Sequence, residues 1–267
     1  MSVWNNQATR WENVGFPTRP SLEDGAIITS IARKNRYGNS STHIAVLGVT
    51  PEVIQLDWPK GSIIEAVDMN PWMIETLYKP HHTFPTMVHQ GYWQSMPMSN
   101  ASVDLVVGDG IFTPLETVND YRALFCEMSR ILKPGGVMII RAFIRPDKCE
   151  KIEDVVSDAL AGKIHYFGSL KWRIAMALVD DSFGIKPAEI YRVFESYFPD
   201  RNSLSALCNW SMETIDTIDS YRDMESIFTF PTLDELTEVS QEYTKIIDIQ
   251  SGSYELANRC PTIVFLF

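Results

Sequence analysis

Apolar positions along this chain follow two patterns, short continuous runs and stripes with a helical period. The first runs are His43 to Leu47, which ends at Gly48, and Ile63 to Val67, which ends at Asp68. Such runs are typical of strands buried on both faces of a parallel sheet. Between them, Thr50-Pro51-Glu52 predicts a helix start, because Thr is a good N-cap, Pro fits the first helical position and an acid favours the first turn. The pattern therefore predicts a strand–helix–strand unit.

Further strands and helices alternate along the first half of the chain. The apolar runs predict a third strand with its exit in Thr86–Trp93, a fourth over Val103–Gly110 and a fifth over Val137–Phe143. Pro71 indicates a second helix start. Tyr121 to Leu132 has apolar residues at helical spacing, and Lys133-Pro-Gly-Gly136 ends that helix. Strands that alternate with helices predict a parallel sheet with right-handed crossovers.

The pattern changes after the fifth strand. From Asp147 to about Ser226 the stripes are helical, which predicts a helical insert that caps the sheet. A helix over Pro231–Tyr243 and strands over Thr244–Ile249 and Pro261–Phe267 then complete the sheet. The link between these two strands is too short for a helical crossover, so we expect them to pair antiparallel.

The N-terminal residues 1–41 carry a capping-box start at Ser21-Leu-Glu-Asp24 and an apolar stripe at Leu22, Ala26, Ile27 and Ile31. We interpret them as an arm and helix packed on the sheet, or as a flap whose aromatic residues Trp4, Trp11 and Phe16 close over a ligand. The expected domains are this arm, a core of residues 42–146 and 227–267, and a helical cap of residues 147–226. The expected fold class is α/β. It has three layers, with a Rossmann-like seven-stranded sheet between two layers of helices, and the last strand of the sheet is antiparallel.

Composition narrows the function classes. With 45% hydrophobic and 21% charged residues, a chain of 267 residues can build a full core. The net charge of −11 disfavours nucleic-acid partners. Without an apolar signal region or a run of about 20 apolar residues, we expect a cytoplasmic protein off the membrane. The four scattered cysteines fit reduced thiols and predict no metal site.

The acid that ends the second strand suggests the ligand. Asp68 follows Gly48 by 20 residues, the spacing at which an acid holds the two hydroxyls of a ribose. A pyrophosphate needs a glycine-rich turn and a bare helix N-terminus, whereas this turn has one glycine and Glu52 places a negative charge there. A nucleoside that carries a cation and no phosphate fits better, and S-adenosyl-L-methionine is such a molecule.

Several segments in order resemble the class I S-adenosylmethionine-dependent methyltransferases. Gly48 matches the first glycine of their motif I, and Asp68 matches their ribose acid. Gln90-Gly-Tyr-Trp93 resembles their adenine loop, Val103 to Gly110 their motif IV strand, and Ile131-Leu-Lys-Pro-Gly-Gly136 the segment before their fifth strand. The resemblance covers residues 42–143 and about 228–267, and not the insert.

The chain departs from the family pattern at positions that usually hold the cofactor. Val46 stands where an acid usually anchors the methionine ammonium, and Tyr92 stands where an acid usually contacts the adenine amino group. Thr50 and Glu52 replace the second and third glycines. Backbone groups can serve in place of the missing side chains.

The resemblance implies a methyltransferase. We expect a small-molecule acceptor, methylated on oxygen or nitrogen, because a separate cap makes an enclosed pocket and the protein is acidic. The expected cofactor site comprises these residues at the carboxyl ends of the strands: Gly48, Val49, Thr50, Asp68, Met69, Tyr92, Trp93, Asp109, Gly110 and Ile111. Asp109 and His165 are the candidate bases, needed where the acceptor must lose a proton. Two alternatives stay open: an inactive methyltransferase fold that serves as a binding or regulatory module, and a nicotinamide oxidoreductase, which the single glycine opposes. A homodimer also stays open.

Overall fold

The computed structural model describes residues 8–35, 41–179 and 183–267, so Trp4 of the expected flap lies outside the described residues. Within them, one seven-stranded sheet has the order β3-β2-β1-β4-β5-β9-β8. Its strands are β1 (His43–Leu47), β2 (Ile63–Asp68), β3 (Thr86–Gln90), β4 (Val103–Asp109), β5 (Leu132–Arg141), β8 (Lys245–Gln250) and β9 (Thr262–Leu266). Neighbours from β3 to β5 pair parallel, whereas β9 pairs antiparallel with both β5 and β8. The predicted fold class is confirmed.

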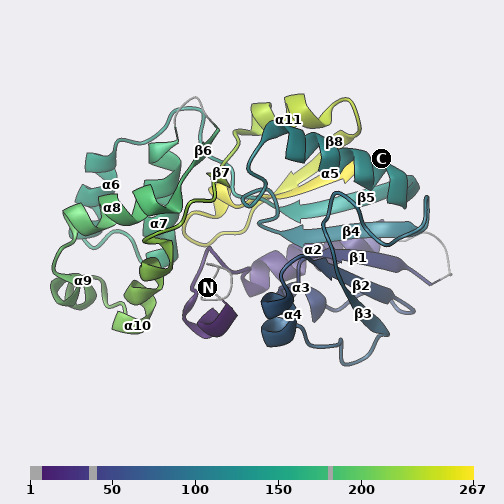
Figure 1. Cartoon of the computed structure of the whole chain (residues 1–267), viewed down its shortest axis with the longest axis horizontal. Coiled ribbons are helices and arrows are strands. Elements are labelled where there is room, and N and C mark those ends of the chain that lie inside the picture. Colours follow the sequence, from purple (N-terminus) through teal and green to yellow (C-terminus); the bar gives the residue numbers. More distant parts are fainter. Residues whose placement is uncertain (1–7, 36–40, 180–182) are drawn as a thin grey trace.

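Helices cover both faces of this sheet (Figure 1). One face carries α2 (Leu22–Lys34), α3 (Pro51–Ile54) and α4 (Pro71–Leu77), and the other carries α5 (Val118–Ile131) and α11 (Leu233–Ser240). Alternate residues of β1 serve the two layers: Ile44 and Val46 pack toward α2, and Ala45 and Leu47 pack toward α5. Because all four are at most 1% exposed, the strand needs a continuous apolar run.

A helical lobe lies beside the sheet and is seen at the left of Figure 1. It contains α6 (Ile152–Leu160), α7 (Phe167–Leu178), α8 (Pro187–Tyr197), α9 (Arg201–Cys208), α10 (Met212–Ile215) and the 3-10 helix η2 (Asp216–Tyr221). Its own apolar core includes Val155, Ile190 and Phe194. Arg173 of α7 and Arg259 both bind the carboxylate of Glu150, at 2.5 and 2.6 Å, and this network ties the lobe to the segment before β9.

A second, two-stranded sheet joins the lobe to the core, and the sequence pattern did not predict it. It pairs β6 (Gly184–Ile185) antiparallel with β7 (Phe228–Thr229). Strands of two residues are too short to leave an apolar period. The described residues contain no helix that is both long and apolar enough to cross a membrane.

The helix that follows the arm confirms its predicted start and corrects its predicted face. Ser21 and Asp24 form the reciprocal capping box, but Leu22 is 95% exposed. The buried face keeps Ile31 of the expected stripe and otherwise runs through Gly25 and Ile28, while Ala26 is exposed. A Cβ on Gly25 would lie 2.9 Å from the side chain of Leu56, so the glycine lets α2 dock closer to α3 than the apolar stripe implied.

Other element bounds differ from the sequence-based expectations at their ends. The helix after β1 is a single turn, α5 begins at Val118 through a capping box of Thr117 and Asp120, and β5 already begins at Leu132. Capping chemistry explains the early start of α5, because the Thr117 side chain satisfies a free backbone N–H. The remaining predicted strands and helices lie where the sequence placed them, to within a few residues.

Candidate active site

The turn after β1 requires a glycine. Gly48 has φ +91°, a conformation that side-chain-bearing residues rarely adopt, and its N–H donates to the carbonyl of Val67 at 2.8 Å. A Cβ built there would lie 3.8 Å from both the Asp68 carboxylate and the Trp93 ring. The ends of β1 and β2 and the loop after β3 therefore meet at one point.

Asp68 is a buried carboxylate at the end of β2. The residue is 8% exposed, and its Oδ1 accepts the backbone N–H of Asn70 at 2.8 Å. Burial raises the pKa of Asp68 to about 6, although the N–H groups of Asn70 and Val49 oppose that rise. A donor ligand that satisfies the carboxylate would offset the cost of burying its charge, as two ribose hydroxyls would.

Two aromatic residues after β3 form the side of the site next to Asp68. The indole N–H of Trp93 donates to the carbonyl of Val67 at 2.7 Å, which fixes the ring beside Gly48. Tyr92 is 61% exposed at the rim. Both rings are placed where the sequence predicted an adenine contact, and that contact stays a prediction.

Asp109, at the end of β4, is engaged by a buried cation. Arg141 of β5 donates from Nε to its Oδ1 at 2.5 Å, and the two side chains are 0% and 5% exposed. Burial raises the pKa of Asp109, while Arg141 opposes the rise. Because the carboxylate is held by Arg141, the ion pair disfavours Asp109 as a general base, a role that stays a prediction.

The N-terminal arm is clamped across the carboxyl ends of the strands. Arg141 Nη1 donates to the carbonyl of Pro17 at 2.8 Å, and Arg19 Nε donates to Glu52 at 2.7 Å. Trp11 Nε1 also reaches Glu52, at 3.3 Å. Since Arg19 balances the charge of Glu52, the expected repulsion of phosphates by a free Glu52 carboxylate loses its basis.

The helical lobe touches the arm through a glycine of α7. A Cβ on Gly168 would lie 2.4 Å from the carbonyl oxygen of Phe16 and 3.0 Å from Oγ1 of Thr18. No larger residue fits there without displacing the backbone. The arm is thus packed between the lobe and the sheet, which matches the packed-arm interpretation while bringing Trp11 to the site.

A cavity of about 410 Å³, here called the site cavity, unites these features. Nine of the ten predicted cofactor residues line it: Gly48, Val49, Thr50, Asp68, Met69, Tyr92, Trp93, Asp109 and Gly110. The tenth, Ile111, is buried in the α5 core and lies outside the lining. His165 also lies outside it; its side chain is 74% exposed and faces Glu255.

The structure adds residues that the sequence did not assign to the site, apart from Trp11, which the flap interpretation had named. Trp11 and Thr18 come from the arm, Thr113 from the loop after β4, Phe143 from the end of β5, Trp172 from α7 and Phe228 from β7. The side-chain polar atoms of Thr18, Thr113 and Trp172 are buried and make no hydrogen bond to any described residue. These residues belong to segments far apart in the sequence, and no local motif marks them.

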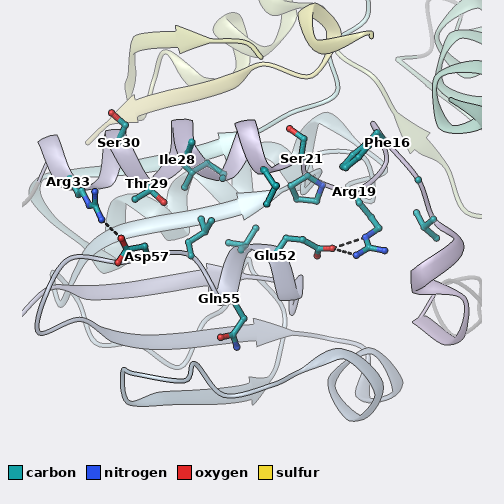
Figure 2. Close-up of a pocket in the computed structure, with 18 of the residues that line it drawn as sticks. Phe16, Arg19, Ser21, Ile28, Thr29, Ser30, Arg33, Glu52, Gln55 and Asp57 are labelled. Atoms are coloured by element: carbon teal, nitrogen blue, oxygen red, sulfur yellow. Dashed lines mark hydrogen bonds and ion pairs between the residues drawn. The ribbon is translucent and has the colours of Figure 1, made fainter. Parts of the chain in front are cut away.

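A larger groove of about 1110 Å³ lies beside α2 (Figure 2). Figure 2 shows ion pairs toward its two ends, Arg19 with Glu52 and Arg33 with Asp57. The groove contains neither Gly48 nor Asp68. The smaller site cavity, which has both, is therefore the candidate active site.

Residues 48–140 match the family model described as a methyltransferase domain. A malonyl-[acyl-carrier protein] O-methyltransferase from Hahella chejuensis is 36% identical over 74 residues, which are 28% of this chain and 25% of the relative. The matched stretch thus spans a quarter of that curated relative.

Solved structures resemble the whole chain at low identity. A Rhodobacter sphaeroides protein with the provisional name of a zinc-dependent alcohol dehydrogenase has a TM-score of 0.59 and 14% identity, over 98% of this chain and 97% of its own. The N-methyltransferase NodS from Bradyrhizobium japonicum, in complex with S-adenosyl-L-homocysteine, has a TM-score of 0.50 and 9% identity over 98% of each chain. Such likenesses show the fold alone.

Residues 48–140 therefore carry a methyltransferase domain, and the sheet order and the buried acid after β2 agree with the class I S-adenosylmethionine-dependent methyltransferases that the sequence resembles. S-Adenosylmethionine, the cofactor expected from the sequence, is the methyl donor of this class. No group of three or more His, Cys, Asp or Glu in the described parts of the chain is arranged to hold a metal ion.

Proposed function

We propose that this protein transfers a methyl group from S-adenosylmethionine to a small-molecule acceptor, on oxygen or nitrogen. The observation that carries the proposal is that one cavity is lined both by Gly48 and Asp68 and by Trp172 and Phe228. A buried acid suits the nucleoside, and the aromatic rings suit an acceptor.

Residues of the chain supply binding and orientation in this proposal. Asp68 accepts the two ribose hydroxyls, Tyr92 and Trp93 flank the adenine, and backbone groups of Gly48 to Thr50 face the methionine end. When bound, the cofactor supplies an electrophilic methyl group on a sulfonium. Because methyl transfer is an in-line displacement, positioning of the acceptor supplies much of the rate.

The helical lobe completes the site in this proposal. We assign residues 147–226 to a cap, residues 42–146 and 227–267 to the cofactor-binding core, and residues 1–41 to the arm. Trp172 and Phe228 enclose the site cavity beside the end of β5, where they exclude water from the reacting atoms. The relative from Hahella chejuensis, which by its name methylates oxygen, supports transfer rather than a regulatory module.

Calorimetry with S-adenosylhomocysteine tests the proposal. We expect binding in the micromolar range, roughly −7 to −8 kcal/mol. Asp68→Ala should weaken it by about 1.5–3 kcal/mol, the scale of hydrogen bonds to a charged group. Asp248→Ala, an exposed acid of β8, is the matched control and should change nothing. Absence of binding by the wild type at millimolar ligand would reject the enzyme and leave the inactive module.

A further inference from the structure

The described walls of the site cavity carry acidic side chains and no lysine, arginine or histidine. The acids are Asp68, Asp109, Glu116 and Asp120. Low-dielectric walls focus the field of such charges, so an anionic ligand would enter against it. Charge therefore disfavours a carboxylate or phosphate on the methyl acceptor.

Three of these acids already have a partner or a role. Asp109 is paired with Arg141, and Asp68 is assigned to the ribose. Asp120 accepts the backbone N–H and the hydroxyl of Thr117, at 2.9 and 2.6 Å, within the capping box of α5. These contacts leave Glu116, which is exposed to solvent, as the lining acid with no cationic partner and no hydrogen bond from another side chain among the described residues.

Glu116 lies at the cap end of the cavity. The backbone N–H of Ile227 reaches its Oε1 at 3.4 Å, and the next residue, Phe228, lines the cavity. The carbonyl of Thr113 accepts the N–H of Thr229 at 3.0 Å. Glu116 and Thr113 therefore both lie beside the short strand β7. Thr113 is 4% exposed, and its buried hydroxyl has no hydrogen-bond partner among the described residues.

Aromatic rings complete this end of the cavity. The ring of Trp172 lies 5.0 Å from that of Phe143 and 6.3 Å from that of Phe228, measured between centroids. Ring faces attract organic cations, most strongly where water is excluded. A carboxylate, a free hydroxyl oxygen and aromatic rings are the groups that recognise an ammonium or amine.

We propose that the methyl acceptor is an amine, held by Glu116, Thr113 and the ring of Phe228, and that this site discriminates against acidic acceptors. The inference rests on the proposed function, because it names the acceptor of the same methyl transfer. It goes further in choosing nitrogen over oxygen and in assigning specificity to Glu116.

The chemical step balances without another reactant. The ammonium gives one proton to bulk water before the nitrogen reaches the methyl group, and the nitrogen lone pair then forms a bond to the methyl carbon. The carbon–sulfur bond breaks, its electron pair stays on sulfur, and a thioether and a methylated ammonium result. The loss of the proton removes one positive charge from the site, and the methyl transfer itself then moves the remaining charge from sulfur to nitrogen without changing the total.

Ligand-observed NMR with three probes of one shape tests the charge preference. Benzylamine is a cation at neutral pH, benzyl alcohol is uncharged and benzoate is an anion. In the presence of saturating S-adenosylhomocysteine, we expect benzylamine to bind in the millimolar range typical of small fragments, and more tightly than benzoate by at least about tenfold. Benzoate binding as tight as that of benzylamine would overturn the proposal, as would no benzylamine binding at about 10 mM.

Two variants then locate the effect. Glu116→Gln removes the charge and keeps the shape, so we expect benzylamine binding to weaken about three- to fivefold while benzyl alcohol is unchanged. Thr113→Val should weaken benzylamine about twofold. Glu242→Gln, an exposed acid after α11, is the control and should alter neither probe. Unchanged benzylamine binding in Glu116→Gln would overturn the assignment.

The outcome is separable from that of the proposed function. S-Adenosylhomocysteine affinity is measured first in each sample, and its absence would reject methyl transfer by itself. The ranking of the three probes, then measured without it, still reports the charge preference of the cavity. Melting temperatures within about 2 °C of the wild type show that each variant stays folded.

Discussion

The guanidinium of Arg141 binds two distant parts of the chain at once, the carboxylate of Asp109 and the carbonyl oxygen of Pro17. It is fully buried, and among the described residues its Nη2 has no hydrogen-bond partner. One cation therefore joins β4, β5 and the arm below the site cavity. The pair holds the arm in place as well as the end of β4.

Arg141→Met should destabilise the protein by about 3–5 kcal/mol, because it leaves the Asp109 carboxylate buried without a counter-charge. Urea unfolding followed by fluorescence would measure this change. The double variant Arg141→Met/Asp109→Leu should recover much of the loss, since no lone charge remains.

Arg33→Met is the matched control for that experiment. Arg33 pairs with Asp57 at the surface, where the two side chains are 55% and 80% exposed, so the loss should stay below about 1 kcal/mol. Equal effects of Arg141→Met and Arg33→Met would contradict the role given to the buried pair.

Asp68 predicts a pH dependence of cofactor binding. Its pKa is raised to about 6 by burial, and in the proposed complex the ribose hydroxyls donate to the ionised carboxylate. Lowering the pH from 7 to 5 should therefore weaken S-adenosylhomocysteine roughly tenfold, since about a tenth of the carboxylate stays ionised at pH 5. Calorimetry at both values measures this, and Asp68→Asn should remove most of the dependence.

Lowering the pH over the same range should stabilise the free protein, although it weakens cofactor binding. The pKa of Asp68 is higher in the folded protein than in the unfolded chain, so its contribution is fully present below pH 4 and is lost as the pH rises through 6. The loss is on the order of 2–3 kcal/mol. If Asp68→Asn and the wild type showed the same pH dependence of urea unfolding, the assigned shift would be wrong.

Glu52→Gln should loosen the arm. The change removes the charge that holds Arg19 and weakens the contact with Trp11. Amide hydrogen exchange over residues 11–20 should become at least several-fold faster, while exchange in β1 and β4 stays the same. Adenine nucleotides should bind the Glu52→Gln variant no more tightly than they bind the wild type, because Arg19 already balances the charge of this carboxylate. Tighter nucleotide binding by Glu52→Gln would restore the repulsion hypothesis.

Trp172→Phe and Trp58→Phe should differ in their effects on stability. The indole N–H of Trp172 is buried without a partner among the described residues, so its removal should leave stability unchanged or raise it. Trp58 donates to the carbonyl of Ile54 at 3.1 Å, and its loss should cost about 1 kcal/mol. Thermal unfolding would compare them. We expect Trp172→Phe to keep cofactor affinity and change acceptor turnover.

The sequence predicted the part of the site cavity around Gly48 and Asp68 better than the part around Trp172 and Phe228. Gly48 and Asp68 each end an apolar strand, so local pattern and spacing locate them, and the parallel sheet then brings them together. Thr18, Thr113 and Trp172 have no such constraint. Thr18 reaches the cavity because Gly168 and Arg141 hold the arm, and Trp172 reaches it from α7 of the lobe. Tertiary packing of that kind leaves no local pattern.

Helix faces were predicted less well than helix starts. The capping box at Ser21 depends on residues three positions apart and is visible in the sequence. The buried face of the same helix depends on Gly25 approaching Leu56, a close contact that an apolar stripe does not encode. Asp109 was similarly identified as a site residue, but its partner Arg141 lies on another strand and was not foreseen.

The glycine contact between α7 and the arm has a consequence for protein synthesis. Residues 16–18 leave the ribosome early, yet Gly168, against which they pack, is made some 150 residues later. At about 5–20 residues per second, that interval lasts roughly ten to thirty seconds. Until α7 has been synthesised, the arm has no helix of the lobe to pack against. The walls of the site cavity can therefore come together only after α7 has emerged.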